Sequence, residues 1–192
     1  MITNTEIVNI AQKEIQAAGI CIKEILGKEV YRHSLNTCRI SLRIATEFEF
    51  NLQEKIDLAM GALLHDIGKS CVSQEILNKE ETLTKDDRML IECHPQQGYL
   101  YLKPFELNQK VLDIVHYHHE RLNGDGYPES LNKKQIDILV QIVSVADVYD
   151  ALTSDRVYHK AKTPETAFKI LEDDNGLNQI VVKILKNTYN LL

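Results

Sequence analysis

The part of the sequence that decides the fold is residues 56–69, which read IDLAMGALLHDIGK. Apolar residues recur there at helical spacing, at Ile56, Ala59, Met60 and Leu63. The predicted helix runs directly into His65-Asp66, so an imidazole and a carboxylate are expected to be buried next to one another. Burial of this pair without partners would cost several kcal/mol, and a bound cation is the simplest compensation.

Helical spacing continues on both sides of this stretch. The apolar positions on the N-terminal side are Ile7, Ile10, Ala11, Ile15, Leu35, Cys38, Leu42 and Ala45, and no segment alternates convincingly with period two. Helix starts are indicated by Thr84, which is followed by two acidic residues, and by Thr163-Pro164. The sequence therefore predicts an all-α fold of about seven to nine helices.

Two segments need separate treatment. Residues 136–148 are predicted to form a buried central helix, although the middle of this run, Ile138 to Val145, would also suit a buried strand. Residues 123–128 read NGDGYP, a run of turn formers that cannot continue a helix. We expect this run to form an ordered loop or a mobile lid.

Composition limits the function. The chain has 192 residues, 44% of them hydrophobic, and a formal net charge of −6. This charge gives no basic surface for a nucleic-acid polymer, whereas local cations or metals can still bind a small anion. The four cysteines form no C-x-x-C pair and suit free thiols in the cytoplasm, and no apolar run is long enough to cross a membrane.

Five of the seven histidines belong to a set of potential metal ligands together with three acidic residues. The set is Glu29, His33, His65, Asp66, His94, His118, His119 and Asp147. Imidazole and carboxylate together suit divalent transition metals, and Asp66 could bridge two ions about 3.5–4 Å apart. Taken singly, His33 or His94 is more often a surface or satisfied core residue, and His118-His119 could end a solvated helix.

The motifs resemble a known family. His65-Asp66-Ile67-Gly68-Lys69 is similar to the signature of HD-domain phosphohydrolases, and residues 118–128 resemble the signature of the HD-GYP branch. The resemblance covers approximately residues 29–171. It implies an HD-domain helical bundle with an ordered Gly-Tyr-Pro loop. It also implies hydrolysis of cyclic di-GMP to linear pGpG or GMP, in which a metal-bridging hydroxide attacks phosphorus.

The same resemblance implies roles for individual residues. Seven members of the ligand set match the family's metal ligands, and Glu29, one helical turn before His33, would favour a third ion. Two or three ions are expected, iron or manganese first, with nickel, zinc, magnesium or calcium as alternatives. Asp66 and Lys69 are the expected catalytic residues, and substrate contacts are expected from Lys69, Arg156, Lys160 and Tyr127. We also expect Glu120 to orient a ligand imidazole and Asp150 and Asp155 to brace Lys or Arg side chains.

Two departures from the family pattern keep alternatives open. Asn123 stands where aspartate is usual, and His159 replaces a usual cation. The alternatives are a phosphohydrolase for another nucleotide, such as a hybrid cyclic dinucleotide or guanosine tetraphosphate, and a metal-bearing binding module with weak catalysis.

We divide the chain into an N-terminal helical extension, residues 1–28, and a catalytic domain, residues 29–192. The expected partners are cyclic di-GMP or a related cyclic dinucleotide, a diguanylate cyclase or sensor protein, and a second copy of the chain. No nucleic-acid polymer or membrane partner is expected.

Overall fold

The computed structural model describes residues 2–79, 81–155 and 160–190, and this part of the chain is helical without a β-strand. Nine of its α-helices have eight residues or more, which confirms the predicted fold class and lies at the upper end of the predicted range. The α-helices are α1 Asn4–Ala17, α2 Ile22–Ile44, α3 Leu52–Leu64, α4 Gln74–Leu77, α5 Lys85–Glu92, α6 His94–Leu102, α7 Gln109–Tyr117, α8 Ile138–Thr153, α9 Pro164–Asp173 and α10 Gln179–Asn190. Short 3₁₀ helices are η1 Ala45–Glu47, η2 Ile67–Cys71 and η3 Lys103–Phe105.

The helix starts follow the local sequence. Thr84 forms a capping box at α5, where its hydroxyl accepts from the backbone N–H of Asp87, and Thr163 caps α9 just before Pro164, both as predicted. The ambiguous run from Ile138 is a helix, and Asp137 caps its start by accepting from the backbone N–H of Leu139.

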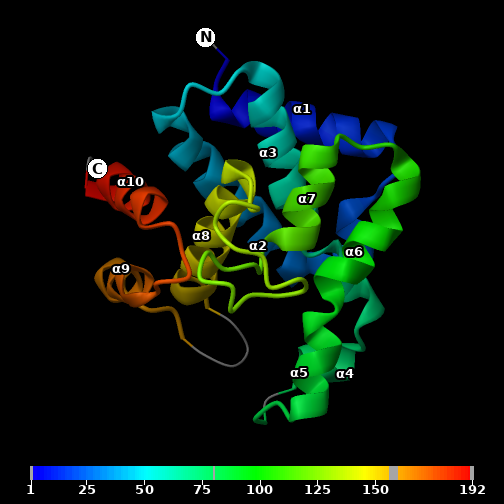
Figure 1. The fold of residues 1–192 in the computed structure, drawn as a ribbon. Coiled ribbons are helices and arrows are strands. Elements are labelled where there is room, and N and C mark those ends of the chain that lie inside the picture. The colour runs from blue at the N-terminus through cyan, green and yellow to red at the C-terminus, as the bar shows by residue number, and fades with distance from the viewer. Residues whose placement is uncertain (1, 80, 156–159, 191–192) are drawn as a thin grey trace.

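The core lies between α2, α3 and α8, which run side by side through the centre of the molecule (Figure 1). α1 and α7 pack on α3, while α9 and α10 pack on α8. Every residue of α3 from Ile56 to Leu64 is buried. α3 and α7 approach closely at Gly61, where an added Cβ would lie 2.5 Å from the Cδ1 atom of Ile114.

α1 shares this core, because its buried apolar face packs against α3. The predicted boundary between residues 28 and 29 falls within α2, just after a break at Gly27, whose φ of 70° is not helical. The division into an extension and a catalytic domain remains a prediction. Among the described residues, no helix combines the length and the apolar content needed to cross a membrane.

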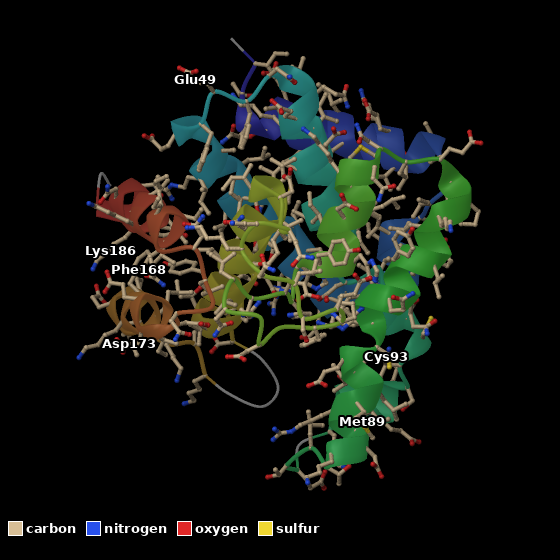
Figure 2. All side chains as sticks on the ribbon, viewed as in Figure 1. Glu49, Met89, Cys93, Phe168, Asp173 and Lys186 are labelled. Atoms are coloured by element: carbon tan, nitrogen blue, oxygen red, sulfur yellow. The ribbon has the colours of Figure 1, made fainter. Side chains whose placement is uncertain are left out.

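α4 and α5 project from the rest of the molecule (Figure 1). Met89 lies on this projection and Cys93 lies at its base, where α5 meets α6 (Figure 2). Cys21, Cys71 and Cys93 are exposed free thiols, whereas Cys38 is buried in α2. Burial raises the pKa of the Cys38 thiol to about 12.

We predict that three thiols of the native protein react rapidly with an aromatic disulfide reagent and that the fourth reacts only on unfolding. Cys38 is protected because its sulfur is covered and its thiolate is strongly disfavoured. Absorbance of the released thiolate gives the count. In a Cys38→Ala variant the rapid count should stay the same and the slow thiol should vanish. Four rapid thiols in the native protein would contradict the packing of α2.

Candidate metal centre

Five of the predicted ligands come from the ends of helices or the segments that join them. His65 and Asp66 lie between α3 and η2, His94 begins α6, and His118-His119 follows α7. His33 and Asp147 lie inside α2 and α8. All of these side chains are buried except His119, which is half-buried. The fold therefore brings seven of the eight predicted ligands to one place in the core.

The ligands form two groups that could each hold a metal ion. His33, His65 and Asp66 make one, and His94, His118 and His119 make the other; within each group the candidate ligand atoms lie within 4.8 Å of one another. These are the groups that the described residues form.

Asp66 belongs to the first group, and its carboxylate also approaches the second. Its Oδ2 atom is 3.5 Å from Nε2 of His65 and 3.8 Å from Nε2 of His33. Its Oδ1 atom is 3.2 Å from Nε2 of His94, in the other group. Asp147 completes the first group, with Oδ1 2.8 Å from Nε2 of His33 and 3.8 Å from Nε2 of His65. The contacts of Asp66 with histidines of both groups are those expected of a carboxylate that bridges two ions.

Three imidazoles are oriented by backbone carbonyls three residues earlier. The Nδ1 atom of His65 lies 2.8 Å from the carbonyl oxygen of Ala62. The Nδ1 atom of His94 lies 2.7 Å from that of Ile91, and the Nδ1 atom of His118 lies 3.0 Å from that of Val115. The last carbonyls of a helix lack intrahelical partners, so they can accept from these rings. Since a carbonyl only accepts, Nδ1 carries the proton in each ring and Nε2 presents a lone pair to the centre.

Several atoms of the centre are left without partners. Nε2 of His65 and Oδ1 of Asp66 are buried and have no hydrogen-bond partner among the described residues. Nε2 of His94 and Nε2 of His118 lie 3.2 Å apart, and both present lone pairs. Two facing lone pairs repel one another unless a proton or a cation lies close to them. The residues present therefore fit divalent metal ions, as the sequence predicted for this set.

His33 differs from the other ligands because carboxylates contact both of its nitrogens. Nδ1 lies 2.6 Å from Oδ2 of Asp150, and Nε2 faces Asp147. Burial lowers the pKa of His33, but the hydrogen bonds with Asp147 and Asp150 outweigh burial and raise it to about 9. We expected Asp150 to brace a Lys or Arg side chain, and the structure instead places it on a ligand imidazole.

The other ionisation states suit metal binding. Burial holds the pKa of His118 and of His119 well below the usual value, so both rings are neutral. Burial raises the pKa of Asp66, but Lys69 and the neighbouring histidines outweigh it and leave the pKa well below its usual value. The pKa of Asp147 is lowered in the same way, chiefly by its hydrogen bond with His33.

Lys69 lies beside the bridging carboxylate. Its Nζ atom is 2.7 Å from Oδ2 of Asp66, three residues earlier, and η2 holds the two side chains together. Gly68 lets η2 lie directly against α6, because a Cβ at this position would overlap the backbone carbonyl of His94. The glycine of the motif is therefore needed for α6 to approach η2.

The Gly-Tyr-Pro loop is ordered and covers His119. The Tyr127 ring stacks on the His119 imidazole, with the ring centroids 4.7 Å apart. The buried carboxylate of Glu120 accepts from the backbone N–H of Glu129 at 2.6 Å and of Leu131 at 2.8 Å. We expected Glu120 to orient a ligand imidazole; both of its oxygens instead fix the loop. Asn123, the departure from the family pattern, donates from Nδ2 to Oδ1 of Asn175 at 3.0 Å and ties the loop to the turn before α10.

A cavity of about 700 Å³ adjoins the centre and includes His33, Asp66 and Lys69 in its wall. A volume of this order suits a small-molecule ligand. Glu29 is exposed and lies outside both ligand groups, but it lines the same cavity. Its role at a third ion remains a prediction.

The remaining predicted contacts are placed only in part. Arg156 and His159 lie outside the described residues. Lys160 is exposed, and its substrate contact, like that of Tyr127, remains a prediction.

Comparisons with known proteins agree with this geometry. The HD domain family profile matches residues 20–180. A Pseudomonas aeruginosa protein named as a cyclic di-GMP phosphodiesterase is 37% identical over 147 residues, 76% of this chain and 36% of the relative. A Vibrio cholerae protein named as a 3′3′-cGAMP-specific phosphodiesterase is 32% identical over 184 residues, 90% of this chain and 39% of the relative.

A solved structure of an HD-GYP-type protein from Bdellovibrio bacteriovorus has the same fold. Its TM-score is 0.74 at 23% identity, and the match covers 97% of this chain and 61% of that one. The chain belongs to the HD domain family, and the resemblance of its motifs to the HD-GYP branch is confirmed. It spans well under half the length of the two curated relatives.

We predict that the affinity for Mn²⁺ rises with pH up to about 9. His33 is protonated at neutral pH in the metal-free protein, because its pKa is raised to about 9, and it must lose this proton to bind a metal. One displaced proton corresponds to about a tenfold gain in affinity per pH unit. Calorimetric titrations at pH 6.5, 7.5 and 8.5 measure this slope.

The matched variant is Asp150→Asn, which removes one of the carboxylates that raise the pKa of His33. The pH-dependent range should move to lower pH in this variant. An affinity that is the same at all three pH values in the wild type would contradict the assigned protonation of His33.

Proposed function

We propose that the chain is a metal-dependent phosphodiesterase that hydrolyses cyclic di-GMP to linear pGpG, to GMP or to both. The observation that carries the proposal is the Asp66 carboxylate, which lies between two groups of histidines at the wall of a cavity of about 700 Å³. The name of the Pseudomonas relative supports the choice of substrate.

Two ions fit the observed ligands. His33, His65, Asp66 and Asp147 would hold one, and Asp66, His94, His118 and His119 would hold the other. Glu29 would contribute to a third from the cavity wall. We propose iron or manganese, which suit mixed imidazole and carboxylate ligands, with nickel, zinc, magnesium or calcium as alternatives.

When bound, such ions lower the pKa of water and stabilise charge on phosphoryl oxygens. The protein's own residues supply the positions and protons. Lys69 presents an ammonium group beside Asp66, where it can stabilise the developing charge on the phosphate or protonate the leaving 3′ oxygen. The backbone carbonyls that hold His65, His94 and His118 keep their Nε2 atoms directed at the centre.

A second candidate is hydrolysis of a hybrid cyclic dinucleotide. The name of the Vibrio relative, which this chain matches over 90% of its length, favours it. A metal-bearing binding module is the remaining alternative. A cytoplasmic location, a diguanylate cyclase or sensor partner, and a homodimer remain predictions.

We predict that Asp66→Ala removes turnover and metal content together. Loss of a partner outside the ligand set typically costs 10- to 100-fold, so loss of a ligand shared by two ions should cost more than about 100-fold. Chromatography of the products from cyclic di-GMP measures turnover, and elemental analysis measures metal. The matched control is Asp173→Ala, an exposed carboxylate at the end of α9 and away from the centre (Figure 2).

The outcomes separate the candidates. Full activity in Asp66→Ala would exclude the proposed centre. Faster turnover of 3′3′-cGAMP than of cyclic di-GMP by the wild type would favour the second candidate. Tight binding of cyclic di-GMP by metal-loaded protein without turnover would favour the binding module.

A further inference from the structure

The wall of the large cavity carries cations that the proposed mechanism does not use. Its lysine and arginine residues are Lys28, Arg32 and Lys69. Lys69 is held by Asp66 at 2.7 Å. The ion pairs formed among the described residues include neither Lys28 nor Arg32. Two cations of the cavity are therefore available to an anionic ligand.

Arg32 is the better placed of the two. It directly precedes the ligand His33 on α2, and its Nη2 atom lies 3.4 Å from the backbone carbonyl oxygen of Asp155, beyond the end of α8. The exposed side chain thus reaches from α2 to the segment that follows α8 along the cavity wall. This long hydrogen bond is weak and occupies one of the five N–H donors of the guanidinium, so a ligand can replace it.

Three of the five acidic residues of the same wall are already engaged, and the other two, Glu24 and Glu29, form no ion pair with Arg32 among the described residues. Asp66 contacts Lys69, Asp150 contacts His33 and Ser154, and Asp155 accepts from the backbone N–H of Ala161 at 2.9 Å. Arg32 therefore faces this side of the cavity without a carboxylate partner among the described residues.

A cyclic dinucleotide contains two phosphodiesters in one ring. When one of them lies at the metal centre, the other carries a full negative charge along the cavity wall. A guanidinium can bind such a phosphate through two parallel hydrogen bonds. A substrate with a single phosphodiester has no second charge to satisfy.

We propose that Arg32 binds the phosphodiester that is not cleaved and so selects cyclic dinucleotides over substrates with one phosphodiester. This inference rests on the proposed function. Arg32 lies outside the motifs that carry the family resemblance, and it is a specificity-determining residue because it contacts substrate away from the reacting atoms.

The test compares two substrates on the Mn²⁺-loaded chain. In Arg32→Ala, KM for cyclic di-GMP should rise about tenfold, the loss expected for a hydrogen-bonded charge pair, while kcat changes little. For bis(p-nitrophenyl) phosphate, which has one phosphodiester, kcat/KM should stay within about twofold of the wild type. Arg32→Lys should recover part of the loss because it keeps the charge without the planar donors.

The matched control is Arg39→Ala, an exposed arginine on the same helix whose neighbours form a separate cavity of about 260 Å³ against α1. It should leave both substrates unchanged. Equilibrium binding of a phosphorothioate analogue of cyclic di-GMP gives a readout without turnover, and Arg32→Ala should weaken it about tenfold.

Other results would overturn the proposal. An equal loss on both substrates would place Arg32 at the cleaved phosphate, and a loss confined to Lys28→Ala would assign the second phosphate to Lys28. No change in analogue binding by Arg32→Ala would exclude the contact. If the wild type hydrolyses neither substrate with any metal, the proposed function fails, and the binding measurement still decides the role of Arg32.

Discussion

The buried carboxylate of Asp66 is the constraint on which the rest of the structure depends. It lies in the core beside the two groups that contain the five ligand imidazoles. One of its oxygens has no hydrogen-bond partner among the described residues. A carboxylate in this position costs several kcal/mol unless cations compensate it. Lys69 supplies one cation at 2.7 Å, and the lone pairs of the surrounding imidazoles define positions for others.

The fold meets this constraint by directing helix ends toward one point. His65, His94 and His118 each follow or begin a helix. In each case a backbone carbonyl from the preceding turn accepts a hydrogen bond from the Nδ1–H group of the ring. Close approach of the elements depends on small residues, since a Cβ on Gly68 would overlap the segment that carries His94. The geometry of the candidate metal centre therefore depends on the same close contacts that pack the core.

Much of the fold and the ligand set could be predicted because periodicity, caps and the HD motif are local in sequence. The apolar helix that ends in His65-Asp66 already required a compensating cation. The strand alternative for residues from Ile138 onward could not be decided by periodicity, because a short, mostly apolar run suits a buried helix and a buried strand alike; the structure shows a helix that Asp137 caps.

The contacts of Glu120, Asp150 and Arg32 could not be predicted. Each depends on which residues meet in space once the chain is folded. Glu120 finds its partners in the loop 9 and 11 residues later, Asp150 meets His33 across a separation of 117 residues, and Arg32 meets Asp155 across 123. A carboxylate beside a histidine motif is compatible with several such partners, so sequence alone suggested the wrong ones for Glu120 and Asp150.

The most direct test of the shared carboxylate is electron paramagnetic resonance of the chain loaded with Mn²⁺. If Asp66 joins two ions, the protein binds at least two Mn²⁺ and gives the broad spectrum of an exchange-coupled pair. A six-line spectrum of isolated Mn²⁺, with one ion bound per chain, would contradict a centre built around Asp66.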